Sequence, residues 1–523
     1  MSICLSRPLT GVRRVTKAPV IITGESLTLE QVYSVCCLDA CVELSQEAKS
    51  RIIASRRTVE ELVERGETVY GVTTGFGRFS DVLITHDECK TLQRNLIITH
   101  AVGAGEPFSR EVSRGIMLLR VNSLAKGYSG ARLEVVETLV DMLNKGVTPV
   151  IPQKGSLGAS GDLAPLSHMV LPMIGLGEAE YRGQVIPGGE AMAAAGIPIV
   201  ELVAKEGLAL INGTQAMTSA GSLAVFDALK LMEAANIAAA LTYEAHRGVI
   251  DALDERVQAV RPHHGQLETA RMLRHYLMNS KNVTQQGEVR VQDRYSLRCT
   301  PQVHGASWEA INYARDRVEI EINSVTDNPI IFSDTGEGIS GGNFHGQPMA
   351  LAFDFLGIAL SELADISERR IESLVNPSIS GLPAFLVRGG GLNSGFMIVQ
   401  YTAAALVSEN KVLAHPASVD SIPSSGNQED HVSMGTIAAR KAYDILKNAR
   451  RVISMEMMCA CQAIDLTGGN CGLGIGTRAA YKTVREVCET LEDDRPLYED
   501  INWCESILLD DRLLDTVRTA YGC

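Results

Sequence analysis

Apolar residues recur with a helical period over long stretches of the second half of the chain. Leu356, Leu360, Leu363 and Ile366 follow one another at spacings of four, three and three, and the same kind of pattern recurs over residues 446–460. Spacings of three and four residues place side chains on one face of an α-helix. We therefore predict two long amphipathic helices, each burying its apolar face.

In the first half of the chain, glycine and proline interrupt the helical patterns more often. Helical patterns are short there, at about 44–65 and 109–145, whereas the patterns lengthen from about residue 200. Glycine and proline, which favour turns, cluster between them at 71–77, 103–107, 146–161 and 186–198. We predict a mainly α fold, in which a loop-rich N-terminal domain (1–215) meets the end of a long central helical bundle (216–523).

Composition supports this fold class and narrows the partners. Of the 523 residues, 45% are hydrophobic but only 5% are aromatic, so small and aliphatic side chains fill the interior and favour helices over a sheet sandwich. The formal net charge of −14 argues against nucleic acid or an anionic membrane as the main partner. A small anionic substrate remains compatible, because a local arginine decides its binding.

The cysteines and the N-terminal residues indicate in which cellular compartment the protein is expected. The twelve cysteines form no CxxC pair and no Cys/His spacing typical of zinc, so we expect free thiols, no metal and a cytoplasmic location. No uncharged apolar run is long enough to cross a bilayer. Residues 1–24 carry four basic residues and no acid, which is compatible with a disordered basic N-terminus or with an organelle-targeting segment.

The candidate chemistry centres on the run Gly155-Ser-Leu-Gly-Ala-Ser-Gly-Asp-Leu-Ala-Pro-Leu-Ser-His168. Glycine lacks a Cβ and lets one backbone segment press onto another. If the Gly161 nitrogen were pressed onto the Ala159 carbonyl carbon, the tripeptide could close into a five-membered ring. Loss of water from the ring and from Ser160 would leave an electrophilic methylidene. The ordinary alternative is a glycine-rich turn.

Further motifs favour the chemical interpretation. In chain order they are Tyr70-Gly-Val-Thr-Thr-Gly-Phe-Gly77, Leu210-Ile-Asn-Gly-Thr214, Gln292-Asp-Arg-Tyr-Ser-Leu-Arg298, Asp327-Asn-Pro329, Gly341-Gly-Asn-Phe-His345 and Asn427-Gln-Glu-Asp-His431. With Gly158-Ala-Ser-Gly-Asp-Leu-Ala-Pro165, this order resembles the ammonia-lyases and aminomutases that use 4-methylideneimidazol-5-one (MIO), above all the histidine-selective members. The resemblance implies a MIO group formed from Ala159, Ser160 and Gly161, no external cofactor, and a homotetramer with shared active sites.

The resemblance also implies roles for individual residues. Tyr70 matches the base that removes the β-proton of the substrate. Free tyrosine has a pKa of about 10, so a nearby cation or helix N-termini would have to lower it. Asn212 matches a residue that holds the substrate carboxylate and polarises the MIO oxygen, and Phe344 matches one packed beside MIO. Taken singly, these residues would be read as a buried tyrosine, a turn asparagine and a core phenylalanine.

A second group of expected site residues lies between 292 and 298. Arg298 is the candidate for the substrate carboxylate, because a guanidinium group binds a carboxylate through two charge-assisted hydrogen bonds. Gln292 and Tyr295 lie in the same segment and match family site positions, Tyr295 as a catalytic residue. An ordinary surface ion pair is the alternative for Arg298.

Substrate choice depends on two positions. His100 lies where the histidine-selective members carry histidine, and Glu429 lies where aryl-selective relatives usually carry glutamine. Such polar groups suit a ring that forms hydrogen bonds and are costly partners for a phenyl ring. We therefore expect non-oxidative deamination of L-histidine to trans-urocanate and ammonia, the first step of histidine degradation. Alternatives are a tyrosine or phenylalanine ammonia-lyase, a 2,3-aminomutase, or a non-catalytic helical oligomerisation scaffold.

Overall fold

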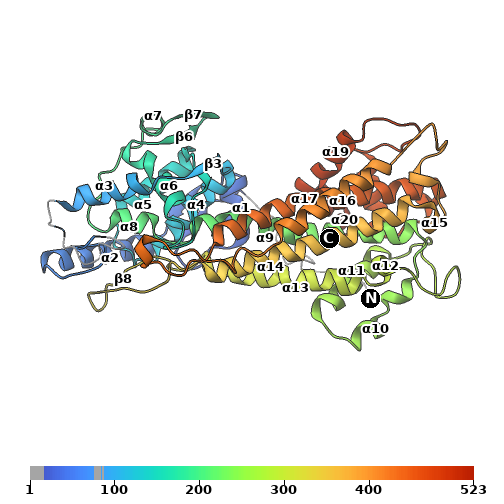
Figure 1. Cartoon of the computed structure of the whole chain (residues 1–523), viewed down its shortest axis with the longest axis horizontal. Coiled ribbons are helices and arrows are strands. Elements are labelled where there is room, and N and C mark those ends of the chain that lie inside the picture. Colours follow the sequence, from blue (N-terminus) through green and yellow to red (C-terminus); the bar gives the residue numbers. More distant parts are fainter. Residues whose placement is uncertain (1–16, 76–83, 85–87, 523) are drawn as a thin grey trace.

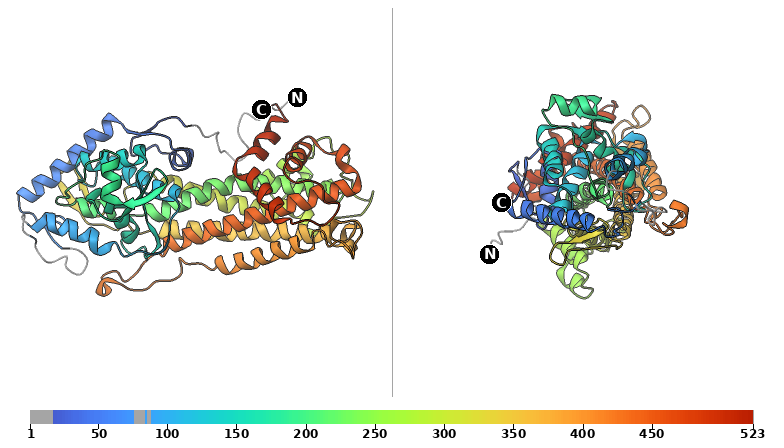
Figure 2. Two further views of the ribbon diagram at one scale, coloured as in Figure 1. Left: turned by 90° about the horizontal axis from the view of Figure 1, so that it is seen from above. Right: turned by 90° about the vertical axis from the view of Figure 1, so that its left-hand side faces the viewer.

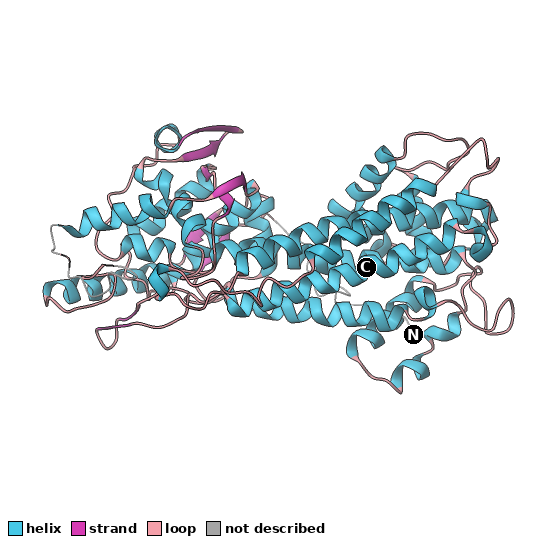
Figure 3. Ribbon diagram, in the orientation of Figure 1, coloured by secondary structure: helices cyan, strands magenta, loops and turns pink. Residues whose placement is uncertain are grey.

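The computed structural model describes residues 17–75, 84 and 88–522 of the chain. The molecule is elongated: short helices and small strands gather at one end, and long helices run side by side toward the other (Figures 1 and 2). Helices dominate throughout (Figure 3), so the predicted mainly α fold is confirmed. The predictions for residues 1–16, and for the last two residues of the motif 70–77, lie outside the described residues.

Five long helices build the bundle. They are α9 (Gln215–Ala245), α13 (Thr300–Glu321), α14 (Gln347–Val375), α16 (Met397–Leu413) and α17 (Gly435–Thr467). Helix α9 is the central one, packing against α13, α14 and α17. Every residue of α9 except Asp227 is buried, because its sequence is rich in alanine and apolar on all sides.

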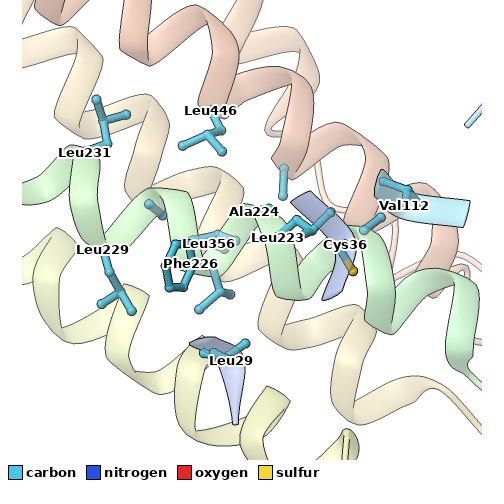
Figure 4. Packing of buried hydrophobic residues seen from close by; sticks show 14 of the residues in the cluster. Leu29, Cys36, Val112, Leu223, Ala224, Phe226, Leu229, Leu231, Leu356 and Leu446 are labelled. Atoms are coloured by element: carbon cyan, nitrogen blue, oxygen red, sulfur yellow. The ribbon is translucent and has the colours of Figure 1, made fainter. Parts of the chain in front are cut away.

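The predicted helical faces are the buried faces. Leu356, Leu360 and Leu363 are fully buried on α14, and Leu446 and Ile453 are fully buried on α17. Figure 4 shows Leu356 and Leu446 packed around the α9 side chains. Apolar spacing alone therefore located both helices and the side of each that faces the core.

The N-terminal half differs in one respect from the pattern expected. The helical stretch at 109–145 is two helices, α4 (Arg110–Ala125) and α5 (Leu133–Lys145). Between them the chain turns at Gly127 and Gly130, whose φ angles of +80° and +69° lie in the left-handed region. Glycine adopts that region without steric cost, so these two residues allow the chain to turn between α4 and α5.

Local signals explain where several N-terminal helices begin and end. Thr28 forms a capping box with Gln31 at the start of α1 (Leu29–Cys37). Ser45 and Ser109 cap α2 (Gln46–Glu64) and α4 through their side-chain oxygens, and Gly146 ends α5 in the left-handed conformation. These caps satisfy backbone groups that a helix end leaves without partners. The remaining helices are α3 (Cys89–His100), α6 (Leu163–Val170), α7 (Gly188–Ala194), α8 (Glu206–Ile211), α10 (Glu255–Ala259), α11 (His264–Tyr276), α12 (Tyr295–Arg298), α15 (Pro377–Ser380), α18 (Ile475–Arg485), α19 (Tyr498–Leu509) and α20 (Arg512–Thr519).

The described strands are short and form small sheets. Strands β1 and β2 pair in parallel, with Val20 opposite Val42, whereas β3–β5, β4–β6–β7 and β8–β9 are antiparallel. Their bounds are β1 (Val20–Ile22), β2 (Val42–Leu44), β3 (Ala104–Pro107), β4 (Thr148–Pro149), β5 (Pro152–Lys154), β6 (Glu178–Tyr181), β7 (Gln184–Pro187), β8 (Ile330–Phe332) and β9 (Glu337–Ile339). Some of their side chains, such as Val20, Ile22 and Val42, belong to the buried core.

One large cluster of buried hydrophobic residues extends from the N-terminal half through the bundle. The division of the chain at residue 215 stays a prediction, although α9 begins at that point. Within the described part of the chain, no helix combines the length and the apolar character needed to cross a bilayer.

Candidate active site

The Ala159–Ser160–Gly161 tripeptide lies in the loop between β5 and α6, compressed at both ends. Gly158 and Gly161 have φ angles of +69° and +75°. A Cβ added at Gly161 would lie 2.2 Å from the Gly213 carbonyl oxygen, and one at Gly158 would lie 2.1 Å from Ser433 Oγ. Only glycine permits such approaches. The tripeptide is therefore held between two segments that come from distant parts of the chain.

Asp162 anchors this loop to the helices behind it. Its Oδ2 accepts a hydrogen bond from the Met217 backbone nitrogen at 2.9 Å, and its Oδ1 accepts from Ser156 Oγ at 2.8 Å and from Thr436 Oγ1. Its own backbone nitrogen donates to the Gly213 oxygen at 2.7 Å. Burial raises the pKa of this carboxyl group, and these hydrogen bonds oppose that shift. The N-terminal turns of α9 and α17 are thereby tied to the tripeptide.

Asn212 approaches the tripeptide from the end of α8. Its Nδ2 donates to the Ser160 carbonyl oxygen at 2.9 Å, and its buried Oδ1 has no hydrogen-bond partner among the described residues. Behind it, the buried Arg120 donates to the Asn212 and Ala209 carbonyl oxygens at 2.9 and 3.0 Å. Burial lowers the pKa of Arg120 to about 10, so its side chain remains a cation at neutral pH. This arrangement aims a fixed amide donor at the Ser160 carbonyl.

Glu429 reaches the other side of Ser160. Ser160 Oγ donates a hydrogen bond to Glu429 Oε1 at 2.9 Å, and Ser424 Oγ donates to Glu429 Oε2 at 2.9 Å. The backbones of Ser424 and Glu429 pair with each other as an isolated antiparallel bridge. The carboxylate is therefore fixed at both oxygens and from its own backbone.

His100 lies at the end of α3, facing the same space. Its Nδ1 is 2.8 Å from the Leu96 carbonyl oxygen, and since a carbonyl only accepts, Nδ1 carries the proton. Burial lowers the pKa of His100, and the Glu429 carboxylate opposes this shift. The ring is therefore neutral at pH 7, with Nε2 as a hydrogen-bond acceptor.

These residues surround one cavity of about 1100 Å³. Its walls include seven residues that the sequence singled out: Tyr70, His100, Ala159, Ser160, Asn212, Phe344 and Glu429. Gly161 follows Ser160 directly in the chain. The structure thus gathers these eight positions, contributed by loops and helix ends, around one space. No group of three His, Cys, Asp or Glu side chains among the described residues could hold a metal ion.

The remaining expected residues, Gln292, Tyr295 and Arg298, lie at the opposite end of the molecule. Helix α12 packs against the far end of α9, where Tyr243 Oη donates to the Leu297 carbonyl oxygen at 2.8 Å. Since α9 has 31 residues, it is about 45 Å long. Figure 1 shows α12 and α8 at opposite ends of the molecule. Within one chain, these residues cannot reach the cavity.

The α12 group is also open to solvent. Tyr295 is 70% exposed, Gln292 is exposed, and the Arg298 guanidinium carbon lies 4.7 Å from the centre of the Tyr295 ring. A half-buried arginine stacked on an exposed tyrosine offers a positive, partly aromatic surface.

The sequence matches the family described as aromatic amino acid lyase over residues 27–486. The chain belongs to this family. It is 61% identical to a histidine ammonia-lyase of Alkaliphilus oremlandii over 96% of this chain and 99% of that one. The crystal structure of histidine ammonia-lyase from Trypanosoma cruzi superposes with a TM-score of 0.90 at 43% identity, covering 96% and 95% of the two chains. A tyrosine aminomutase from Streptomyces globisporus superposes with a TM-score of 0.92 at 39% identity, covering 95% and 98%.

The lyase site also contains residues that the sequence analysis did not single out. His345 and His431 line the cavity with a ring-nitrogen separation of 3.3 Å, and Asn328 lines it from the loop between α13 and β8. Each of the three falls inside a motif quoted above, so position within the motifs was an available signal. Arg120 lies in no motif, and only the folded chain reveals its contact with Asn212.

Proposed function

We propose that this lyase removes ammonia from L-histidine to give trans-urocanate. The observation that carries the proposal is that His100 and Glu429 both line the cavity that contains Ser160. Both offer hydrogen-bond acceptors, Nε2 and a carboxylate, which suit the N–H group of an imidazole ring and the two N–H groups of its protonated form. The names of the relatives at 61% and 43% identity support the same substrate. The proposal includes a cytoplasmic location, supported by the free thiols of the ten described cysteines.

We propose further that Ala159, Ser160 and Gly161 form MIO. The fit rests on the compression of the tripeptide by Gly213 and Ser433, and on the Asn212 amide that donates to the oxygen the group would carry. Once formed, MIO supplies an electrophilic methylidene carbon for capture of the substrate. Asn212 would hold the substrate carboxylate and polarise the oxygen of the group through its side-chain amide. Phe344 lines the same cavity.

In this proposal Tyr70 removes the β-proton of the substrate. Tyr70 is half-buried and lines the cavity. A tyrosine must lose its own proton to act as a base, and its ordinary pKa of about 10 makes that costly at neutral pH. The N-termini of α6 and α9 meet at Asp162 close to the cavity, and the positive end of a helix dipole favours a nearby anion.

The substrate carboxylate requires a cation that the cavity of one chain does not supply through Arg298. We propose that the protein is a homotetramer and that the partner subunit's Arg298 binds this carboxylate. Exposed apolar side chains along α14 and α16 support an assembly, since such patches mark protein interfaces. They include Phe355, Ile358, Ile398 and Tyr401.

The function is tested by following the ultraviolet absorbance of urocanate during incubation with histidine, tyrosine or phenylalanine. We expect growth with histidine alone; a β-amino acid product would favour the aminomutase alternative, for which the tyrosine aminomutase fold likeness is the support. Ser160→Ala should abolish turnover, because no methylidene can form. Glu429→Gln should lower kcat/KM for histidine while leaving the stability of the fold largely unchanged. Unchanged histidine kinetics would contradict the substrate assignment.

Site sharing is tested by complementation. Ser160→Ala and Arg298→Ala are each expected to be inactive, but co-expression produces assemblies in which some cavities hold an intact Ser160 and an intact partner arginine. Partial recovery of activity is the expected result. If the mixed assemblies stay as inactive as the single variants, the proposal that the partner subunit's Arg298 serves this cavity is refuted.

A further inference from the structure

Glu429 holds the hydroxyl group that the proposed self-processing reaction must expel. Among the described residues, the one hydrogen bond of the Ser160 hydroxyl group goes to Glu429 Oε1, at 2.9 Å. The two residues are 269 positions apart. The hydroxyl is thus held from a distant segment of the chain.

The Glu429 carboxylate is itself held rigidly. Ser424 Oγ donates to its second oxygen at 2.9 Å, and the Ser424 and Glu429 backbones exchange hydrogen bonds of 3.0 and 3.3 Å. A serine side chain has three staggered rotamers, and a hydrogen bond to a fixed carboxylate selects one of them. Hydrogen bonds to charged acceptors are stronger than those between neutral groups.

We propose that Glu429 is a positioning residue for loss of the Ser160 hydroxyl, besides its role in binding the substrate ring. This inference rests on the proposed function, in which the tripeptide forms MIO. It assigns to one carboxylate oxygen two successive partners, first the serine hydroxyl and then an N–H of the substrate.

The reaction balances without any co-reactant. The Gly161 nitrogen bonds to the Ala159 carbonyl carbon, and its proton passes to the carbonyl oxygen; this new hydroxyl then leaves with the Ser160 N–H proton as the first water, giving a C=N bond. In the second step the Ser160 Cα–H electron pair becomes the Cα=Cβ bond. The Ser160 hydroxyl departs with the C–O pair and the Cα proton as the second water. Glu429 fixes the direction of the C–O bond that breaks.

A consequence follows for the order of events. While Ser160 keeps its hydroxyl, Glu429 Oε1 is engaged at 2.9 Å. Loss of the hydroxyl removes this donor, whereas Ser424 still holds Oε2. The carboxylate is then left in place with one oxygen facing the cavity, ready to accept a hydrogen bond from the substrate ring. Self-processing thus completes the substrate site as well as the electrophile.

The test measures the mass of the chain, which does not depend on activity. Wild type, Glu429→Ala, Glu429→Gln and the control Asp430→Ala are synthesised in parallel, and the intact mass is followed with time. Asp430 is an exposed acid on the same cavity wall, with no contact to Ser160 among its described hydrogen bonds. Thermal unfolding midpoints confirm that each variant is folded.

We expect wild type and Asp430→Ala to lose two waters at the same rate. Glu429→Ala should lose the second water about tenfold to hundredfold more slowly, as expected for a missing hydrogen bond to a charged group. Glu429→Gln should stay within a few-fold of wild type, because its amide oxygen still accepts from the hydroxyl.

Two outcomes would overturn the inference: processing of folded Glu429→Ala at the wild-type rate, or a block in folded Glu429→Gln as severe as in the alanine variant. In both cases a wild-type chain lighter by two waters leaves the proposed function intact. A wild-type chain that keeps both waters would instead refute the proposed MIO group itself.

Discussion

Replacing Gly161 by alanine adds one methyl group at the tightest point of the candidate site. The new Cβ would lie 2.2 Å from the Gly213 oxygen and 2.4 Å from the Gly213 carbonyl carbon, whereas ordinary contact begins at 3.4 Å. Relieving the first overlap requires the two backbones to separate by about 1 Å. That movement pulls apart the 2.7 Å hydrogen bond from the Asp162 nitrogen to the Gly213 oxygen.

The magnitude follows from these two effects. Losing a buried hydrogen bond costs about 1–3 kcal/mol, and holding alanine at a φ of +75° costs about 1–2 kcal/mol more. The variant should be destabilised by about 2–5 kcal/mol. It should also keep both waters, because moving the two backbones apart removes the contact with Gly213 that, in the proposed function, presses the tripeptide toward ring closure.

Gly183→Ala is the matched control. Gly183 has a φ of +77°, but no heavy atom lies within 4 Å of an added Cβ. It therefore carries the conformational cost without the clash, about 1–2 kcal/mol, and its chain should be processed normally. Urea unfolding and intact mass provide the two measurements. The steric argument is refuted if Gly161→Ala unfolds at the same urea concentration as Gly183→Ala and also loses two waters.

Three further predictions concern a buried ion pair, a buried histidine at the far end of α9, and Asn212 in the site. Lys205 and Asp327 form a fully buried ion pair with an N–O distance of 2.7 Å. Lys205→Met should lower the free energy of unfolding by about 3–5 kcal/mol, because the Asp327 carboxylate would stay buried without its cation. A loss below about 1 kcal/mol in urea unfolding would contradict this. Burial lowers the pKa of His246 to about 4, so the folded chain keeps it neutral while the unfolded chain protonates it below about pH 6.5, and stability falls by up to about 3 kcal/mol as pH drops from 6.5 to 4. His246→Gln should flatten that dependence in unfolding curves measured across this range, and an unchanged slope would rule the explanation out. Asn212→Leu should reduce kcat/KM for histidine by about a hundredfold to a thousandfold, since the Ser160 carbonyl loses its donor; a reduction below tenfold in the urocanate assay would count against that role.

The candidate site illustrates how far local sequence reaches. The glycines of the 155–161 run indicate a backbone that can be compressed, because only glycine combines a positive φ with a missing Cβ. The run does not indicate what compresses it. Gly213 and Ser433 supply that contact, and neither is related to the run by any spacing along the chain.

The α12 residues show a limit of a different kind. Gln292, Tyr295 and Arg298 were expected to share a site with Ser160 on the basis of the family resemblance. A single uninterrupted helix, α9, lies between these residues and Ser160. Hydrogen bonding along the helix keeps α9 extended, so its two ends cannot approach each other. Sharing within one chain is therefore excluded by rigidity, and an assembly becomes the natural proposal.

By itself, the sequence determined the helical class, the faces of α14 and α17 that turn inward, and the tripeptide that carries the candidate chemistry. Each of these depends on neighbours within a few positions, where helical period and glycine stereochemistry act directly. The tertiary structure alone decided that Glu429 holds the Ser160 hydroxyl, that Arg120 supports Asn212, and that α12 lies at the far end. Those facts arise from contacts between segments dozens to hundreds of residues apart, which only the packing of the whole core brings together.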